Sequence, residues 1–345
     1  MRAFSKVLFS GLRALQRELS KEEWQEAKYT ILLDENTFQF CLPRLVSSVD
    51  ALQEAEFIEV PIGEECKSME VAAQVWQTLL EGEVNRQHVI VNLGGGSVCD
   101  LGGFVAAGYK RGIRHIHVPT TLLGMVDAAI GGKTAIDFGG VKNSIGFFYP
   151  AVLTVIEPSF LDTLPQKEYL NGMMEMVKTA AVTDPALFEQ LLSTTRYPLP
   201  TIKEVARIKA RVTKADPYDH SIRKILNFGH TFGHAIEAYS HLPHGIAVGI
   251  GMEAAMYLST KKLGLSEGIY CTYSRWLKQM LSTAHCPLPA FSLKDIEKML
   301  PLMHQDKKNA TGSVCCVLLQ ALGAAVIDVE VSDNEVRDAF LKLGR

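Results

Sequence analysis

The sequence predicts a protein of two domains, an N-terminal α/β domain and a mostly α-helical C-terminal domain. Its 345 residues exceed the size at which a single hydrophobic core keeps growing. Short apolar or β-branched runs alternate with helix-like segments up to about residue 160, whereas helical periodicity dominates from residue 161 onward. We therefore expect the domains to span residues 1–160 and 161–345.

The first domain is predicted to hold a parallel sheet with helices on its faces, because strands and helices alternate along it. Segment 1–13 is basic, but Ser5 and Ser10 interrupt its apolar stretch and no small-residue cleavage site follows. It is therefore interpreted as a first strand and helix and not as a targeting segment. Helices are expected at 68–80 and 101–107, and further strands at 29–33, 57–60, 88–93, 115–118 and 152–156.

The second domain is predicted to be helical because apolar residues recur there with the α-helical period. Strand-like runs are nearly absent until 314–319 and 325–331. Helices are expected at 169–182, 202–213, 230–240, 245–263 and 293–303.

Composition excludes several classes of protein. No apolar run reaches the roughly 18–20 residues that a membrane helix needs. The net charge of −3 argues against a nucleic-acid-binding surface, which normally shows a basic surplus. The seven cysteines are odd in number, scattered and without a Cys-x-x-Cys pair, so neither a disulfide framework nor a cysteine zinc site is indicated. This pattern fits a cytoplasmic protein.

A glycine triplet, Gly94 to Gly96, follows the buried strand predicted at 88–93 and precedes a helix. Glycines let backbone amides approach a pyrophosphate, and the helix N-terminus adds partial positive charge. The triplet lacks the Gly-x-Gly-x-x-Gly spacing, so a tight structural turn and a nucleotide site both remain open. Asp34, which ends an earlier strand, has two interpretations as well: a ligand for a ribose hydroxyl or a cap of the next helix.

A second polar cluster lies between residues 119 and 143, among apolar residues and glycines. Buried polar groups need a ligand or one another as partners, and these residues are difficult to assign to a solvated face. We therefore expect them at a functional site. The cluster contains Thr120, Thr121, Asp127, Gly131, Gly132, Lys133, Lys142 and Asn143.

A third cluster has the composition of a metal site. Glu175 lies among methionines on a predicted helix. The alternative to metal binding is that it forms an i,i+3 ion pair with Lys178. One carboxylate and two imidazoles with an open position are typical of catalytic zinc. The spacing is not His-Glu-x-x-His, so a zinc protease is not indicated. Four of the ten histidines fall within fifteen positions: His230, His234, His241 and His244.

Five cations near these motifs are further candidates, although each alone would ordinarily lie on the surface. Arg223 precedes Asn227 by four residues and His230 by seven, which would place all three on one helix face. The five are Arg111, Lys209, Arg223, Lys307 and Lys308.

Taken together, these motifs resemble those of the 3-dehydroquinate synthases, in order, from about Asp34 to Lys308. Examples are Gly-Gly-Gly-x-x-x-Asp from residue 94, Asp-x-x-x-Gly-Gly-Lys from 127 and Leu-Asn-Phe-Gly-His-Thr-x-Gly-His-Ala-Ile-Glu from 226. The resemblance implies a Rossmann-like dinucleotide-binding domain, a helical metal-binding domain and an active site between them. It also implies a cytoplasmic homodimer in which Arg111 reaches the phosphate bound by the neighbouring subunit.

The resemblance assigns roles to individual residues. A divalent metal, zinc or cobalt, would be held by Glu175, His230 and His244, and His234 would lie beside the substrate phosphate instead. NAD would contact Asp34, Glu64, Lys67, Gly95, Gly96, Asp100, Thr120, Thr121 and Thr163. The substrate would contact Asp127, Lys133, Lys142, Asn143, Lys178, Lys209, Arg223, Asn227, His234 and either Lys307 or Lys308.

Two departures from the family pattern are visible. The segment Asp216–Ser221 replaces an acidic loop ahead of the arginine, and an expected glutamate and glycine are missing from it. This leaves the loop geometry and the reaction rate open, but not the type of reaction. Met173 and Met174 stand where the family has a small residue, which we expect to change packing only.

The implied activity is that of a lyase. The substrate, 3-deoxy-D-arabino-heptulosonate 7-phosphate, would be oxidised transiently by NAD, lose phosphate, be reduced again, and close after ring opening to 3-dehydroquinate. Alternatives are another sugar-phosphate cyclase, a metal-dependent polyol dehydrogenase that uses NAD stoichiometrically, and a non-catalytic binding protein. The set of phosphate-directed cations argues against the dehydrogenase.

Overall fold

The protein divides into two compact units in a computed structural model that describes residues 4–304 and 313–343. The first unit runs to Pro165 and also includes Ile202–Tyr218, and the second comprises Gln166–Thr201 and the chain from Asp219 onward. A single boundary after residue 160 therefore needs correction, because Ile202–Tyr218 returns to the first unit. Within that unit the Arg207 guanidinium lies 4.7 Å from the centre of the Phe9 ring, a cation–π contact that fixes the returning segment.

A six-stranded parallel sheet forms the centre of the first unit. The five strands expected at 29–33, 57–60, 88–93, 115–118 and 152–156 are all present, as are the first strand and helix. Every residue of the two strands β2 and β4 is buried, as expected of a sheet covered on both faces. The strand order is β1 (Lys6–Leu8), β8 (Leu153–Val155), β5 (Arg114–Pro119), β4 (Val89–Gly94), β2 (Tyr29–Leu33) and β3 (Glu56–Glu59).

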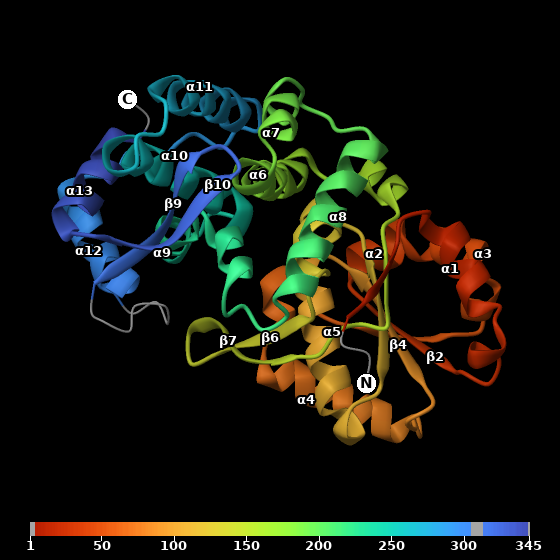
Figure 1. The fold of residues 1–345 in the computed structure, drawn as a ribbon. Coiled ribbons are helices and arrows are strands. Elements are labelled where there is room, and N and C mark those ends of the chain that lie inside the picture. Colours follow the sequence, from red (N-terminus) through yellow and green to blue (C-terminus); the bar gives the residue numbers. More distant parts are fainter. Residues whose placement is uncertain (1–3, 305–312, 344–345) are drawn as a thin grey trace. The chain divides into compact units, whose positions relative to one another are not determined.

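Helices lie on both sides of this sheet (Figure 1). On one side α4 and α5 enclose a core in which Leu79, Leu101 and Phe104 are buried. On the other side α1 packs against α3 and against strands β1 and β8. The helices of the unit are α1 (Gly11–Leu19), α2 (Glu35–Phe40), α3 (Leu42–Ser48), α4 (Met69–Glu81), α5 (Gly96–Gly108) and most of α8 (Leu199–Ala215).

After β5 the chain forms an antiparallel hairpin of β6 (Lys133–Phe138) and β7 (Val141–Phe148), which was not predicted from the sequence and is separate from the six-stranded sheet. Its two-residue turn, Gly139-Gly140, has φ values of +61° and +76°. Two consecutive glycines of positive φ are typical of the tight hairpin turn whose twist matches that of the strands. The Gly-Gly step between two alternating runs was therefore a usable signal.

Strand β5 carries two histidines, His115 and His117, into the core of the first unit. The ring of His115 stacks on that of Tyr149, with 5.4 Å between centroids, and Nδ1 of His117 lies 3.2 Å from the Asn92 amide nitrogen. Burial lowers the pKa of His117 to about 3, and burial together with neighbouring His117 lowers the pKa of His115 far below its usual value. Both rings are therefore neutral in the folded protein.

Acid should destabilise the protein through these two rings. Unfolded histidines take up protons below about pH 6.5, whereas the folded pair does not until far lower pH, so the free energy of unfolding should fall as pH decreases from about 6.5 towards 4. Each ring contributes at most about 1.4 kcal/mol per pH unit. Urea unfolding at several pH values measures this slope. His115→Phe should reduce it, whereas His285→Asn, at an exposed position, should not; equal slopes in all three proteins would contradict the assignment.

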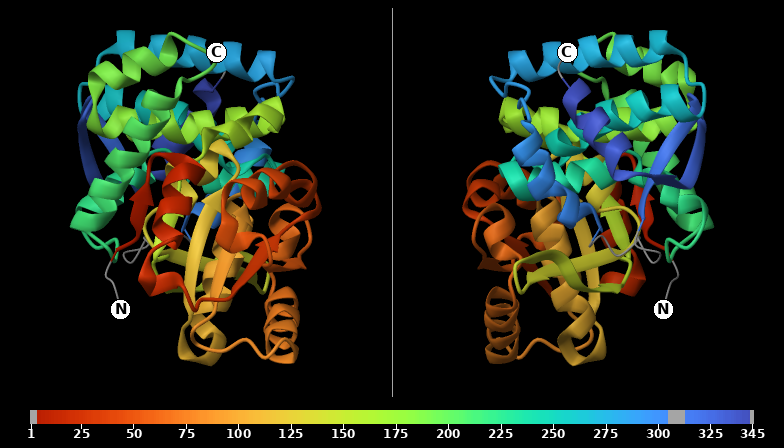
Figure 2. Two further views of the ribbon diagram at one scale, coloured as in Figure 1. Left: turned by 90° about the vertical axis from the view of Figure 1, so that its right-hand side faces the viewer. Right: turned by 90° about the vertical axis from the view of Figure 1, so that its left-hand side faces the viewer.

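The second unit is mostly helical, as expected (Figure 2), and its contacts place α10 (His244–Lys262) at its centre. This helix packs against α6, α9, α11, α13 and strand β9, and it is buried from Gly245 to Ser259. In the part of the chain that the structure describes, no helix is both long enough and apolar enough to cross a membrane. The other elements are α6 (Gln166–Thr183), α7 (Pro185–Leu192), α9 (His230–Ser240), α11 (Glu267–Thr283), α12 (Leu293–His304), α13 (Asp333–Lys342) and the antiparallel pair β9 (Val314–Ala321) and β10 (Ala324–Val331).

Candidate functional site

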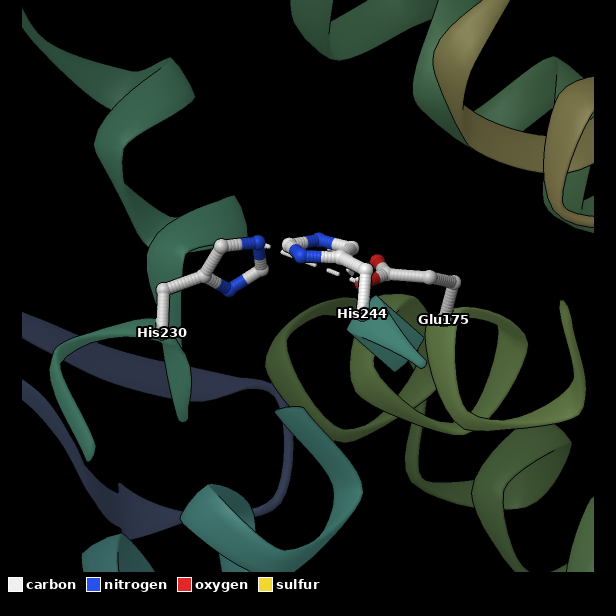
Figure 3. A group of neighbouring side chains, drawn as sticks. All are labelled: Glu175, His230 and His244. Carbon is white, nitrogen blue, oxygen red and sulfur yellow. Dashed lines mark ion pairs between the residues drawn. The ribbon is translucent and has the colours of Figure 1, made fainter. Parts of the chain in front are cut away.

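Three potential metal ligands from three helices of the second unit converge (Figure 3). Glu175 lies in α6, His230 is the first residue of α9, and His244 is the first residue of α10. One ligand atom from each lies within 4.8 Å of the others. The Nε2 atoms of His230 and His244 are 3.9 and 3.6 Å from Oε1 of Glu175. The structure thus brings together the three residues that the family resemblance assigned to the metal.

The backbone before α9 sets the direction of His230. Gly229 has a φ of +79°, a left-handed conformation that favours glycine. A Cβ added there would lie 2.5 Å from Cγ of Met252 in α10, so the position also has no room for a side chain. The 3₁₀ turn Ile222–Asn227 ends just before this break. A continuous helix face shared by Arg223, Asn227 and His230 was therefore a wrong expectation, because the left-handed residue separates the turn from α9.

Glu175 has the environment of a metal-binding carboxylate. Its side chain is fully buried, and apart from an ion pair with Lys178 neither carboxylate oxygen has a hydrogen-bond donor among the described residues. A buried carboxylate is costly unless cations compensate it, and here the Lys178 ammonium pairs with Oε2 while Oε1 faces the two imidazoles. The side chain of His244, in contrast, is 36% exposed, which leaves one side of the triad open. Two imidazoles, one carboxylate and an open side fit a catalytic divalent ion.

Both ligand imidazoles are oriented by an acceptor at Nδ1. The Nδ1 atom of His230 lies 3.3 Å from the carbonyl oxygen of Phe228, and that of His244 lies 2.9 Å from Oε2 of Glu237. A carbonyl or carboxylate oxygen can only accept, so each Nδ1 carries a proton, and in the neutral ring the lone pair is then on Nε2. Those lone pairs belong to the atoms that approach Glu175. Glu237 was quoted in the sequence motif but given no role.

The other two histidines of the cluster lie outside the triad. His234 follows His230 by one turn of α9, as predicted, and their ring centroids are 5.3 Å apart. It is exposed, and its ring centroid is 5.8 Å from that of His244, so it borders the triad. His241 adopts a left-handed conformation, with φ of +55°, at the end of α9. The neighbouring residues expected at the substrate, Lys178 and Arg223, are buried, and Asn227 is half-buried.

The glycine triplet in the first unit forms the junction between β4 and α5. The amide of Thr120 donates to the carbonyl oxygen of Gly94, at 2.9 Å. A Cβ at Gly95 would lie 3.1 Å from Cγ2 of Thr121, and one at Gly96 would lie 3.0 Å from Cβ of Ala128. Four residues expected at NAD, Gly95, Gly96, Thr120 and Thr121, are therefore assembled at the N-terminus of a 13-residue helix. Backbone amides at such a terminus suit a pyrophosphate.

A polar network continues from this loop. The buried ammonium of Lys67 donates to Asp100, at 3.0 Å, and to the side-chain oxygen of Asn143, at 2.5 Å, and it lies 3.7 Å from Glu64. Burial disfavours the charge, but Asp100 and Glu64 outweigh it and raise the pKa of Lys67. Burial also raises the pKa of Asp100, although Lys67 opposes this. The amide of Asn143 donates to Asp137, at 2.7 Å, a contact that the sequence analysis did not anticipate.

Two other residues expected at NAD have local roles in this structure. Asp34 caps α2: its carboxylate accepts from the amide of Thr37, and the Thr37 hydroxyl accepts from the amide of Asp34. The capping interpretation of Asp34 is therefore confirmed, which leaves its contact with NAD a prediction. Thr163 ends a 3₁₀ turn, where its hydroxyl lies 3.4 Å from the carbonyl oxygen of Phe160.

The residues of the first unit that are expected to contact the substrate lie in two places, around Asp127 and on the hairpin β6–β7. Asp127 forms an ion pair with Lys209 of α8, so two of them meet directly. Lys133, Lys142 and Asn143 all belong to the hairpin β6–β7 and are exposed. The expectation that they avoid a solvated face was wrong, because the hairpin stands apart from the six-stranded sheet. Lys307 and Lys308 lie outside the described residues.

Arg111 is presented by a braced turn after α5. Lys110 and Arg111 have φ values of +47° and +66°, and Gly112 follows at +108°. Arg86 donates twice to the carbonyl oxygen of Lys110, at 3.0 and 2.9 Å, and the Lys110 ammonium donates to the carbonyl oxygen of Val84, at 2.6 Å. Strained backbone persists only where its surroundings hold it, and it often does so at functional positions. Arg111 itself is exposed.

Comparison with known proteins gives the relatives of this chain. The family model for the 3-dehydroquinate synthase N-terminal domain matches residues 57–171, and that for the C-terminal domain matches residues 172–309. A 3-dehydroquinate synthase from Parabacteroides distasonis is 36% identical over 332 residues, covering 91% of this chain and 90% of that protein. These matches extend over both structural units.

Solved structures of cyclases have the same fold. A 2-deoxy-scyllo-inosose synthase in complex with carbaglucose-6-phosphate, NAD+ and Co2+ is 22% identical, with a TM-score of 0.86 over 98% of this chain and 96% of that one. A 2-epi-5-epi-valiolone synthase from Streptomyces hygroscopicus with NAD+ and Zn2+ bound is 26% identical, with a TM-score of 0.85 over 99% and 97%. The expected α/β and helical architecture is therefore confirmed.

Proposed function

Because the chain belongs to the 3-dehydroquinate synthase family, we propose that it converts 3-deoxy-D-arabino-heptulosonate 7-phosphate to 3-dehydroquinate and phosphate. This reaction belongs to the shikimate pathway of aromatic amino acid biosynthesis. The observation that carries the proposal is the convergence of Glu175, His230 and His244 in a chain that matches both domains of the family. The enzyme would be a cytoplasmic lyase that depends on NAD and a divalent metal.

The proposed metal ligands are Oε1 of Glu175 and the Nε2 atoms of His230 and His244. The chemistry supplied by a bound divalent ion is polarisation of a substrate hydroxyl, whose pKa it lowers. The imidazole and carboxylate ligands suit zinc or cobalt, the ions in the two cyclase structures similar to this chain. Lys178 pairs with Glu175 and would help to neutralise the buried carboxylate.

The proposed NAD site is centred on the β4–α5 junction, where the amides after Gly95 would hold the pyrophosphate. The chemistry supplied by a bound NAD is transient oxidation of one substrate carbon, which is reversed later in the cycle. Lys67 connects Asp100 to Asn143 and would keep the loop and the hairpin in register. Asp34, Glu64 and Thr163 remain proposed NAD contacts.

The substrate carries a carboxylate and a phosphate, which suit the concentration of cations among the site residues. We assign the phosphate to Lys133, Asn143, Asn227 and His234. Held by these donors, the phosphate would leave by elimination, with one of its own oxygens positioned to accept the neighbouring proton. The remaining proposed contacts are Asp127, Lys142, Lys178, Lys209, Arg223 and one of Lys307 and Lys308.

We also propose a homodimer in which Arg111 serves the partner's phosphate. The braced left-handed turn supports this role, because it holds an exposed arginine in one backbone conformation without burying it. An arginine fork is well suited to bind a phosphate group.

Product identification tests the proposed function. The purified protein, supplied with the heptulosonate phosphate, NAD and zinc or cobalt, should release phosphate and form 3-dehydroquinate, which NMR identifies. A heptulose phosphate without the carboxylate should react far more slowly, because the cations directed at that group would lose their partner. Faster turnover of the carboxylate-free sugar would favour another sugar-phosphate cyclase activity.

A further inference from the structure

The buried carboxylate of Glu237 lies outside the triad and contacts the imidazole of His244, a member of the triad. Glu237 lies in α9, two turns after His230, and its side chain is 8% exposed. Its Oε2 accepts the Nδ1–H of His244, the first residue of α10, at 2.9 Å. The left-handed conformation of His241 ends α9 between the two residues. Glu237 and His244 therefore connect the ends of two consecutive helices.

The two imidazoles of the triad differ in the acceptor that holds them. His230 faces a neutral acceptor, the carbonyl oxygen of Phe228, at 3.3 Å. His244 faces a carboxylate at a shorter distance, 2.9 Å. A charged acceptor forms the stronger hydrogen bond. It also increases the basicity of the opposite ring nitrogen, which is the atom that would donate its electron pair to a metal. That nitrogen, Nε2 of His244, lies 3.6 Å from Oε1 of Glu175.

The position of His244 makes this support necessary. Its side chain is 36% exposed, compared with 11% for His230, so packing restrains its ring less. A ring flip would put Cδ2 in the place of Nδ1 and Cε1 in the place of Nε2, so that the Nε2 lone pair would no longer face Glu175. The Glu237 hydrogen bond opposes that flip because the flip would break it. It also selects the tautomer with the proton on Nδ1, because a carboxylate accepts a hydrogen bond and has no proton to donate.

We propose that Glu237 is a positioning residue that holds His244 in the tautomer and orientation needed for metal binding and increases its donor strength. This inference rests on the proposed function, in which Glu175, His230 and His244 hold a divalent metal. It assigns to Glu237 a role in metal affinity and none in contact with substrate.

The test measures zinc affinity by competition with a chromophoric chelator in the full-length protein. Outer-shell partners of this kind contribute about 10–100-fold to metal affinity. We expect Glu237→Gln, which loses the charge, to bind zinc about tenfold more weakly, and Glu237→Ala about a hundredfold more weakly. In the cobalt-loaded Glu237→Gln protein the visible absorption bands should shift, because they report the ligand field at the metal.

Matched variants separate positioning from folding. Glu253→Gln removes another buried carboxylate, one that accepts from Ser274 in the same unit, and should leave zinc affinity and the cobalt spectrum unchanged. The melting temperature of each metal-free variant shows whether it is folded. If folded Glu237→Gln and Glu237→Ala bind zinc like the original protein, the inference is wrong. If the original protein binds zinc no better than His230→Ala, the proposed metal site itself is wrong.

Discussion

Alanine at His230 or His244 should remove bound metal and nearly abolish phosphate release, because each change deletes one of three converging ligands. A metal ion contributes several kcal/mol of charge stabilisation, so we expect kcat to fall roughly a thousandfold or more. Elemental analysis of the purified variants gives the metal content, and a phosphate assay gives the rate. Full metal content in His230→Ala would contradict the assignment.

His234→Ala is the matched control on the same helix. Its ring borders the triad, but it is exposed and lies outside the group of converging ligand atoms. We therefore expect this variant to keep its metal while releasing phosphate more slowly. Loss of metal from His234→Ala, with metal retained in His244→Ala, would instead support a site built from two histidines on one helix face.

A mixture of two nearly inactive variants should recover activity if Arg111 acts across a dimer interface. When Arg111→Ala and His230→Ala chains are co-expressed and pair at random, about half of the dimers are mixed. Each mixed dimer has one site that combines an intact His230 with an arginine donated by the partner. About a quarter of all sites should then be active, by the reciprocity of two-fold contacts.

The control for this experiment is native mass spectrometry, which shows whether mixed dimers have formed. If Arg111 acts within its own chain, every site lacks either the arginine or the metal ligand, and no recovery can occur. Mixed dimers confirmed by native mass spectrometry but without activity would reject the shared site. Arg111 would then be a residue of its own chain's braced turn, without a role in the partner.

Much of the first unit could be predicted because its local patterns agree with its tertiary structure. The strand predicted at 88–93 is β4, and the helix predicted after it is α5. The glycine triplet forms the junction between them. The hairpin β6–β7 was missed because its polar residues were interpreted as one cluster around a ligand. The Gly139-Gly140 step between two alternating runs was the overlooked feature.

The grouping of Glu175, His230 and His244 could not be derived from spacing alone. His230 and His234 share a face of α9, which favours them as a ligand pair, whereas the structure brings in His244 from the next helix. This change of partner depends on how α9 ends at His241 and how α10 packs against it, which are tertiary properties. The family resemblance supplied the grouping that the structure shows, because it carries that tertiary information.

The error concerning Arg223 has a similar cause. Its spacing to Asn227 and His230 fits one helix face, but the left-handed Gly229 ends the turn before α9 begins. A glycine within an apparently helical pattern is compatible with either outcome. Here the helix is interrupted at Gly229, where the backbone packs closely against Met252 of α10. This tertiary contact cannot be read from the local sequence.

The number of phosphate ions released per NAD molecule tests the central claim most directly. In the proposed reaction the cofactor is reduced and reoxidised within each cycle, so a trace of NAD should support many turnovers. Phosphate should accumulate far beyond the amount of NAD, without growth of the NADH absorbance band at steady state. NADH that accumulates in proportion to the substrate consumed would contradict the proposal and indicate a metal-dependent dehydrogenase.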